Sequence, residues 1–228
     1  MPSLSRKPLA RRRLLHSGLA LAGAAVLGAP ALASSRRSLP AMTEGPFYPP
    51  RAWREAWPDW DADLTRVQRR DGSTLTARGD ALGLALRVVD TRDRLIDGAE
   101  VEIWQCDALA QYRHPSVQRS IDTATGFDPG FQGFGSARSD AQGALRFRTI
   151  RPVAYPGRTP HIHVLLRHAS FGSVVSQLFV AGDPGNARDF LWRGLREDER
   201  SALALDLKPA APDSGLAYSA QHLLVVPA

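Results

Sequence analysis

The sequence contains almost no cysteine: Cys106 is the only one among 228 residues. A single cysteine excludes an intramolecular disulfide framework and any zinc or iron–sulfur site built from several thiolates. Cys106 alternates with Trp104 in an apolar run, so we expect it to be a small buried side chain rather than a reactive thiol. Internal repeats and low-complexity tracts are also missing, which favours one ordinary folded domain.

Acidic residues are missing from residues 1–33, which hold five of the 29 basic residues. The remainder is nearly neutral, at +1, so the net charge of +6 does not indicate a nucleic-acid partner. Arg11-Arg12 and the apolar run 18–33 resemble a twin-arginine signal peptide that ends at Ala33. The run has only 16 residues, three of them Gly and one Pro, too few for a stable membrane anchor. We therefore expect 1–33 to be a signal peptide and the protein to be exported, to the periplasm or the exterior.

Glycine and proline are abundant, with 19 and 17 residues, which favours a turn-rich fold over a helical bundle. Residues 34–81 show no sustained periodicity and are expected to form an irregular N-terminal arm. Residues 82–228 are expected to form a single all-β domain, a β-sandwich with long irregular loops. Short alternating runs predict strands at 82–90, 99–106, 145–150, 161–168, 174–180 and 221–226. Helical patterns are confined to 187–195 and 197–205.

His161-Ile162-His163 lies within one of these predicted strands. Residues two apart point to the same face of a strand, so both imidazoles could bind one metal ion while Ile162 enters the core. The same pattern also suits a surface or hydrogen-bonded histidine pair. His-Glu-x-x-His is absent, and no acid occurs in the fifteen residues after His163. A metal site here would therefore need another anionic ligand.

Two of the four tyrosines are candidates for that ligand. Tyr112 follows the predicted strand 99–106, and Tyr155 stands six residues before His161. A phenolate is a hard anionic donor that suits ferric iron. Spacing alone leaves two other interpretations open: Tyr112 could be a solvent-facing loop residue, and Tyr155, before a proline, could pack on the edge of the sandwich.

Several segments together resemble the intradiol ring-cleavage dioxygenases, especially the protocatechuate 3,4-dioxygenase-like branch. The resemblance extends over about residues 43–226 and includes Thr43-Glu44-Gly45-Pro46-Phe47-Tyr48 in the arm. It rests on these further segments: Val101-Glu102-Ile103-Trp104-Gln105, Tyr112-Arg113-His114, Asp128-Pro129 through Gly135, Phe147 to Pro152, Tyr155-Pro156-Gly157-Arg158-Thr159-Pro160-His161-Ile162-His163, and Gln177 to Asp183.

The resemblance implies a non-haem Fe(III) ion held by Tyr112, Tyr155, His161 and His163. It implies a catechol-type substrate, cleaved by O2 between its two hydroxyl-bearing carbons to give a muconate-type diacid. Tyr155 would also act as a base, Arg158 would stabilise negative charge on the bound ring, and Gln177 would donate a hydrogen bond beside it.

The sequence also departs from the family pattern. Cys106-Asp107 replaces a common Ala-Asn, Ala110-Gln111 replaces a common Gly-Arg or Gly-Asn, and segment 116–127 is longer than usual. These positions bear on the shape of the pocket and on the identity of the substrate. The alternative is a transthyretin-like binding module without catalysis, which Val88-Val89-Asp90 and residues 98–103 also resemble. A homo-oligomer is compatible with either interpretation.

Overall fold

The computed structural model describes residues 36–56, 59–118 and 126–228, so the expected signal peptide lies outside the described residues. Helices among the described residues are all short, and none is long and apolar enough to cross a membrane. The elements in chain order are α1 Arg51–Ala56, β1 Arg66–Gln68, β2 Thr74–Thr76, β3 Ala81–Asp90, β4 Glu100–Trp104, α2 Pro115–Gln118, β5 Phe134–Arg138, β6 Ala144–Ile150, β7 His161–His168, β8 Gly172–Val180, η1 Pro184–Arg188, α3 Phe190–Gly194, α4 Glu197–Leu203, β9 Ala204–Leu205, β10 Lys208–Pro209, η2 Pro212–Ser214 and β11 Tyr218–Val226.

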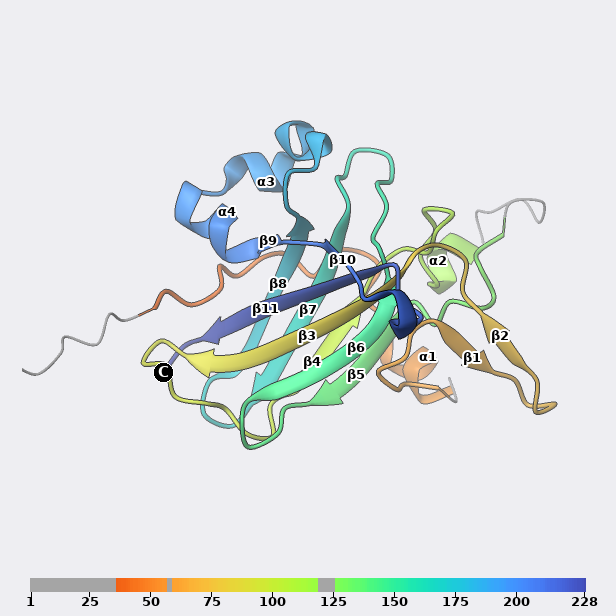
Figure 1. Ribbon diagram of the computed structural model, residues 1–228, viewed down its shortest axis with the longest axis horizontal. Helices are drawn as coiled ribbons and strands as arrows, with labels where there is room; N and C mark the ends of the chain where they lie inside the picture. Colours follow the sequence, from red (N-terminus) through yellow and green to blue (C-terminus); the bar gives the residue numbers. More distant parts are fainter. Residues whose placement is uncertain (1–35, 57–58, 119–125) are drawn as a thin grey trace, which may run out of the picture. The chain divides into compact units, whose positions relative to one another are not determined.

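Two sheets packed face to face form the domain, which confirms the expected single β-sandwich. One sheet has the order β10-β11-β3-β6 and the other β5-β4-β7-β8-β9 (Figure 1). In two sheets packed in this way, each strand directs every second side chain into the space between the sheets. Leu84 and Leu86 of β3 are buried in this core together with Ile162 and Val164 of β7.

Strand β7 has opposite chemistry on its two faces. Ile162 and Val164 are fully buried in the core, so His161 and His163 must lie on the outer face of the five-stranded sheet. His163 is directly opposite Trp104 of β4 and Gln177 of β8, and directly opposite residues share a face. This outer face is nevertheless covered, because both histidines are only 2% exposed.

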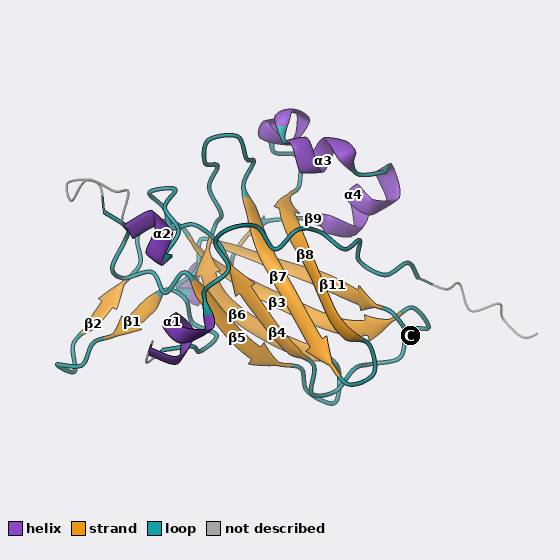
Figure 2. Ribbon diagram, turned by 180° about the vertical axis from the view of Figure 1, so that it is seen from behind, coloured by secondary structure: helices purple, strands orange, loops and turns teal. Residues whose placement is uncertain are grey.

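The N-terminal arm provides part of the cover. It runs across β8, where the backbone N–H of Met42 donates to Val175 O (Figure 2). The prediction that 34–81 is irregular was wrong in part, because the segment also contains α1 and the β1–β2 hairpin. The hairpin turn has Gly72 at φ +83°, and the N–H of Arg69 donates to Ser73 O.

Two further features differ from the sequence prediction. Strand β5 was not predicted because glycine disfavours strands; here Gly135 is needed, since a Cβ would lie 2.4 Å from Asp61 O. The helix expected over 187–195 is divided at Asp189, whose backbone is extended at φ −71° and ψ 125°. The helix expected over 197–205 ends at Leu203, where the chain continues as β9.

Candidate metal centre and active site

The two histidines of β7 meet at their Nε2 atoms, which are 3.2 Å apart. His161 Nδ1 donates to the carbonyl oxygen of Thr159 at 2.6 Å, so its Nε2 carries the lone pair. Trp104 stacks on His163 with ring centroids 4.7 Å apart and planes 12° apart. Each ring is thus held in one orientation, with its Nε2 directed at the same point.

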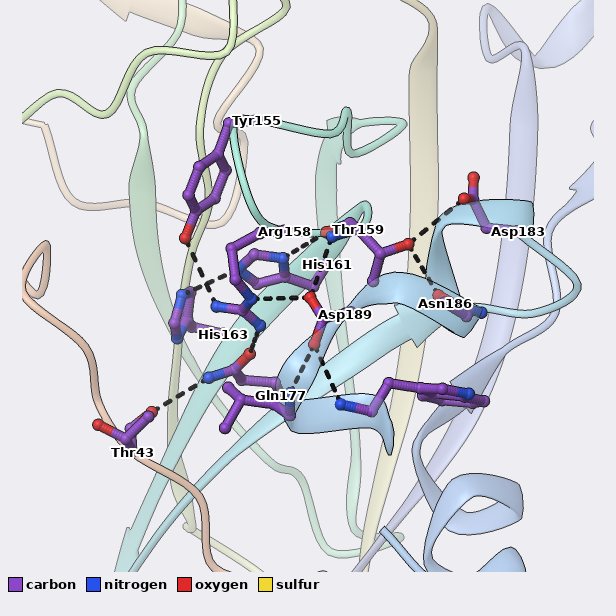
Figure 3. A network of polar contacts seen from close by, with 12 residues as sticks. Thr43, Tyr155, Arg158, Thr159, His161, His163, Gln177, Asp183, Asn186 and Asp189 are labelled. Carbon is purple, nitrogen blue, oxygen red and sulfur yellow. Dashed lines mark hydrogen bonds and ion pairs between the residues drawn. The ribbon is translucent and has the colours of Figure 1, made fainter. Parts of the chain in front are cut away.

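The two tyrosines reach this point from separate loops. The Tyr112 hydroxyl lies 3.4 Å from His161 Nε2, and the side chain is 4% exposed. Tyr155 is less buried; its ring centroid lies 5.6 Å from that of Tyr112 and 5.5 Å from that of His161. The structure therefore brings together all four residues for which the sequence suggests metal ligation. Figure 3 shows three of them, Tyr155, His161 and His163.

Burial determines the charge states of this cluster in the metal-free protein. Burial, and secondarily the Arg158 cation, lowers the pKa of His161 to about 4. Burial, and secondarily His161 and Arg158, lowers the pKa of His163 well below its usual range. Burial raises the pKa of Tyr112 well above its usual range. The imidazoles are thus neutral, and among the described residues no group of three or more His, Cys, Asp or Glu is arranged to hold a metal. The tyrosine oxygens are the donors that would become anionic, by losing their protons on metal binding.

Arg158 lies at the edge of the cluster, with a side chain that is 9% exposed. Its Nη2 donates to Gln177 Oε1 at 2.6 Å, its Nε donates to Asp189 Oδ2 at 2.8 Å, and its Nη1 lies 3.5 Å from the Tyr155 hydroxyl. Figure 3 shows these contacts as one network. The amide of Gln177 donates to Thr43 O of the arm at 3.1 Å. Gln177 therefore links Arg158 to the arm, whereas the sequence suggested only a donor beside Arg158.

The N-terminal arm closes the cluster from outside. Phe47 stacks on Tyr112, with ring centroids 4.5 Å apart and planes 20° apart. Gly45 lies beside His163, where an added Cβ would make an ordinary contact, 3.5 Å from Cε1 of the imidazole. Residues 45–47 of the arm thus lie against Tyr112 and His163.

A buried carboxylate on β4 anchors the arm. Glu102, whose side chain is 7% exposed, accepts from the Tyr48 hydroxyl at 2.6 Å. It also pairs with Arg54 at 3.2 Å and with Arg167 at 3.0 Å. Paired in this way, the buried charge is compensated. No separate role was predicted for Glu102, although an acid within the apolar run 101–104 is a signal for a buried ion pair.

The profile of the family described as Dioxygenase matches residues 44–224 of the chain. The chain belongs to the intradiol ring-cleavage dioxygenases. The beta chain of protocatechuate 3,4-dioxygenase from Burkholderia cepacia is 36% identical over 151 residues, which cover 63% of this chain and 61% of that protein. Hydroxyquinol 1,2-dioxygenase from Corynebacterium glutamicum is 29% identical over 126 residues, which cover 47% and 38% of the two chains. The chain thus spans less than two thirds of the length of these relatives.

Solved structures of intradiol dioxygenases share the fold. An intradiol ring-cleavage dioxygenase from Tetranychus urticae superposes with a TM-score of 0.62 at 21% identity, covering 84% of this chain and 95% of that one. Catechol 1,2-dioxygenase from Acinetobacter sp. ADP1 gives a TM-score of 0.61 at 21% identity, covering 84% and 63%. These similarities place the sandwich within the architecture of the intradiol dioxygenases.

The departure from the intradiol dioxygenase pattern at Asp107 has a structural role. Its Oδ1 accepts from the N–H groups of Leu109 and Gln111, both at 2.9 Å, and its Oδ2 accepts from the N–H of Asp128 at 2.6 Å. Asparagine has only one acceptor oxygen and could not make all these bonds in the same orientation. The carboxylate therefore fastens the loop before Tyr112 to the 126–133 segment. Residues 119–125, most of the longer segment, lie outside the described part of the chain.

The second departure, at Ala110, places a residue with a Cβ in the left-handed region, at φ +62°. This conformation costs about 1–2 kcal/mol for a residue other than glycine. We expect Ala110→Gly to raise the free energy of unfolding by about 1 kcal/mol, because glycine removes that cost but loses more entropy on folding. Urea unfolding measures the change. Ala141→Gly is the control, since Ala141 is an exposed turn residue without positive φ; a loss of stability in Ala110→Gly would contradict the expectation.

Proposed function

We propose that the protein is an exported non-haem ferric dioxygenase. It would cleave a catechol-type ring between the two hydroxyl-bearing carbons and place both atoms of O2 in a muconate-type diacid. The observation that carries this proposal is the meeting of two neutral imidazoles and two phenols beside the Arg158 cation. Family membership supports the same chemistry.

The donor set fits Fe(III). Tyr112, Tyr155, His161 and His163 would hold the ion, because phenolate oxygens suit a hard ferric centre and a neutral imidazole can offer the lone pair of its Nε2. The bond from His161 Nδ1 to Thr159 O fixes the tautomer that this ligation requires. When bound, Fe(III) draws electron density from a chelated catecholate and makes its ring reactive toward O2.

The protein side chains supply positioning and charge. Substrate would approach from the side of Tyr155 and Arg158, because these are partly exposed whereas Tyr112 and the histidines are buried. The Tyr155 oxygen would accept a proton from the catechol. Burial raises the pKa of Tyr155 above its usual value, and the Arg158 cation beside it partly offsets that rise. Arg158 would stabilise negative charge that develops on the ring.

Product analysis tests the proposal. The mature chain, loaded with Fe(III), is incubated with a panel of catechols under ¹⁸O2, and oxygen uptake is followed. We expect one O2 per substrate and a diacid that carries two ¹⁸O atoms. A semialdehyde from cleavage outside the two hydroxyls would contradict the proposal. Fully iron-loaded protein that consumes no O2 with any catechol would favour the transthyretin-like binding module instead.

Export is the second part of the proposal, and it rests on residues 1–33. We expect an Arg11→Lys, Arg12→Lys double variant to remain as precursor in the cytoplasm, because a twin-arginine signal requires both arginines. Fractionation of a bacterial host with a twin-arginine pathway, followed by immunoblotting, measures the distribution. Arg6→Lys, Lys7→Arg, which lies in the same charged region, is the control. Normal export of the double variant would show that the signal is of another type.

A further inference from the structure

Asp189, in the extended link between η1 and α3, is a buried acid to which the reaction assigns no role. The residue is 1% exposed, and four N–H donors fill its two oxygens. Oδ1 accepts from the backbone of Leu191 at 2.9 Å and of Trp192 at 3.0 Å. Oδ2 accepts from Arg158 Nε at 2.8 Å and from the Thr159 N–H at 3.0 Å.

Capping of α3 explains only half of these contacts. A helix N-cap needs one acceptor oxygen, and asparagine, serine or threonine supplies it as well as aspartate. Burying an ionised carboxylate is costly unless a cation compensates it. Here the compensating cation is Arg158, the residue placed beside the candidate metal ligands. The charge of Asp189 and its second oxygen therefore serve the active site rather than the helix.

The contact with Asp189 sets the direction of the guanidinium group. This group is planar and its donors have fixed relative directions. With Nε held by Asp189 and Nη2 held by Gln177, the plane is fixed and Nη1 is directed at the Tyr155 hydroxyl. Gln177 is tied to Thr43 of the arm in turn. Without Asp189, Arg158 would keep one anchor and could rotate about it.

The same oxygen also acts on the next residue. Asp189 Oδ2 accepts from the N–H of Thr159, and the carbonyl oxygen of Thr159 accepts from His161 Nδ1. The carboxylate thus contacts two consecutive residues, of which Arg158 is the one whose side chain lies beside Tyr155. Figure 3 shows Asp189 between Arg158 and the first turn of α3.

We propose that Asp189 is a positioning residue for ring cleavage, acting by holding the Arg158 guanidinium toward the substrate site. The proposal rests on the proposed function. On this proposal, a residue in the η1–α3 link, 26 residues beyond His163, affects turnover through Arg158.

The test compares Asp189→Asn in two backgrounds of the iron-loaded protein. Asparagine keeps the size and the capping oxygen but removes the charge and presents an amide to Arg158. In the otherwise wild-type protein, we expect Asp189→Asn to lower kcat about 10–100-fold and to leave the iron content unchanged. This magnitude is typical for the loss of a residue that orients an active-site group. In an Arg158→Ala background, the same substitution should change kcat less than about threefold, because residues that act as a unit are not additive. An equal loss in both backgrounds, or no loss in either, would overturn the proposal.

Arginine labelling provides a readout that does not depend on turnover. Phenylglyoxal modifies accessible guanidinium groups, and mass spectrometry of peptides measures the rate at Arg158 in the metal-free protein. We expect Arg158 to be labelled several-fold faster in Asp189→Asn than in wild type, and an unchanged rate would overturn the proposal. Wild-type protein that cleaves no catechol would overturn the proposed function, whereas the labelling ratio alone decides whether Asp189 holds Arg158.

Asp183→Asn is the matched control. Asp183 lies in the same segment, caps η1 through Gly185 N at 2.8 Å and accepts from the Thr159 hydroxyl at 3.3 Å, so its carboxylate is bonded to residues other than Arg158. We expect its kcat and its Arg158 labelling rate to stay within about twofold of wild type. Effects as large as those of Asp189→Asn would mean that any damage to this segment disturbs the site, which would contradict a specific role for Asp189.

Discussion

His163→Ala is expected to abolish iron binding and, with it, all turnover. The imidazole is 2% exposed, its Nε2 lies 3.2 Å from that of His161, and no other described His, Cys, Asp or Glu cluster could replace it. Loss of a group that merely orients a ligand lowers metal affinity about 10–100-fold, so loss of the ligand itself should cost more. Metal analysis after dialysis against a weak chelator measures the iron retained per chain.

The control for this prediction is His168→Ala. His168 lies on the same strand but at its far end, where its Nδ1 contacts the Ser170 hydroxyl at 2.8 Å. We expect this variant to retain iron and activity. Circular dichroism checks that His163→Ala is folded, since removal of the ring also removes its stacking on Trp104. A folded His163→Ala protein with a full complement of iron would contradict the assignment.

Arg158→Ala is expected to lower kcat about 10²–10³-fold while iron content stays unchanged. The guanidinium contacts Tyr155, Gln177 and Asp189 but neither histidine, so it contributes charge rather than ligation. The magnitude is that of removing one preorganised donor from an active site. Steady-state oxygen uptake with the best catechol gives kcat and KM.

Arg158→Lys separates charge from geometry. Lysine keeps the positive charge but cannot hold Gln177 and Asp189 with one planar group, so we expect activity between that of wild type and Arg158→Ala. Arg146→Ala, an exposed arginine of β6, is the control for general effects of charge. Activity of Arg158→Ala within a few-fold of wild type would show that the cation has no part in the reaction.

Strand periodicity predicted most strands of the sandwich but not β5. The alternation of His161 and His163 with Ile162 and Val164 determined which face of β7 bears the polar residues, because that periodicity is local. Strand β5 was missed because its one glycine, Gly135, is required by a contact with Asp61, more than seventy residues earlier in the chain. Such long-range crowding leaves no local pattern.

The candidate site was predicted in the same uneven way. Individual residues such as Tyr112, Tyr155 and Arg158 were found through motif resemblance, and the structure brings them together. The supporting roles of the carboxylates Glu102 and Asp189 were not predicted, because the partners of these residues come from distant segments. The partners lie in the arm for Glu102 and in the loop before β7 for Asp189. Asp189 even lies within a stretch whose composition predicted continuous helix. The role of a buried charge depends on its partners, and these are set only by the folded chain.

The visible spectrum of the iron-loaded protein tests most directly whether Tyr112 and Tyr155 bind Fe(III). Phenolate oxygen on ferric iron gives a charge-transfer band in the visible range, which histidine or carboxylate ligation does not. We predict a wine-red wild-type protein, an altered band in Tyr155→Phe, and an unchanged band in Tyr218→Phe, whose ring lies on β11 beside Arg151. A colourless wild-type protein fully loaded with iron, or a loaded Tyr112→Phe, Tyr155→Phe double variant with the original spectrum, would contradict phenolate ligation.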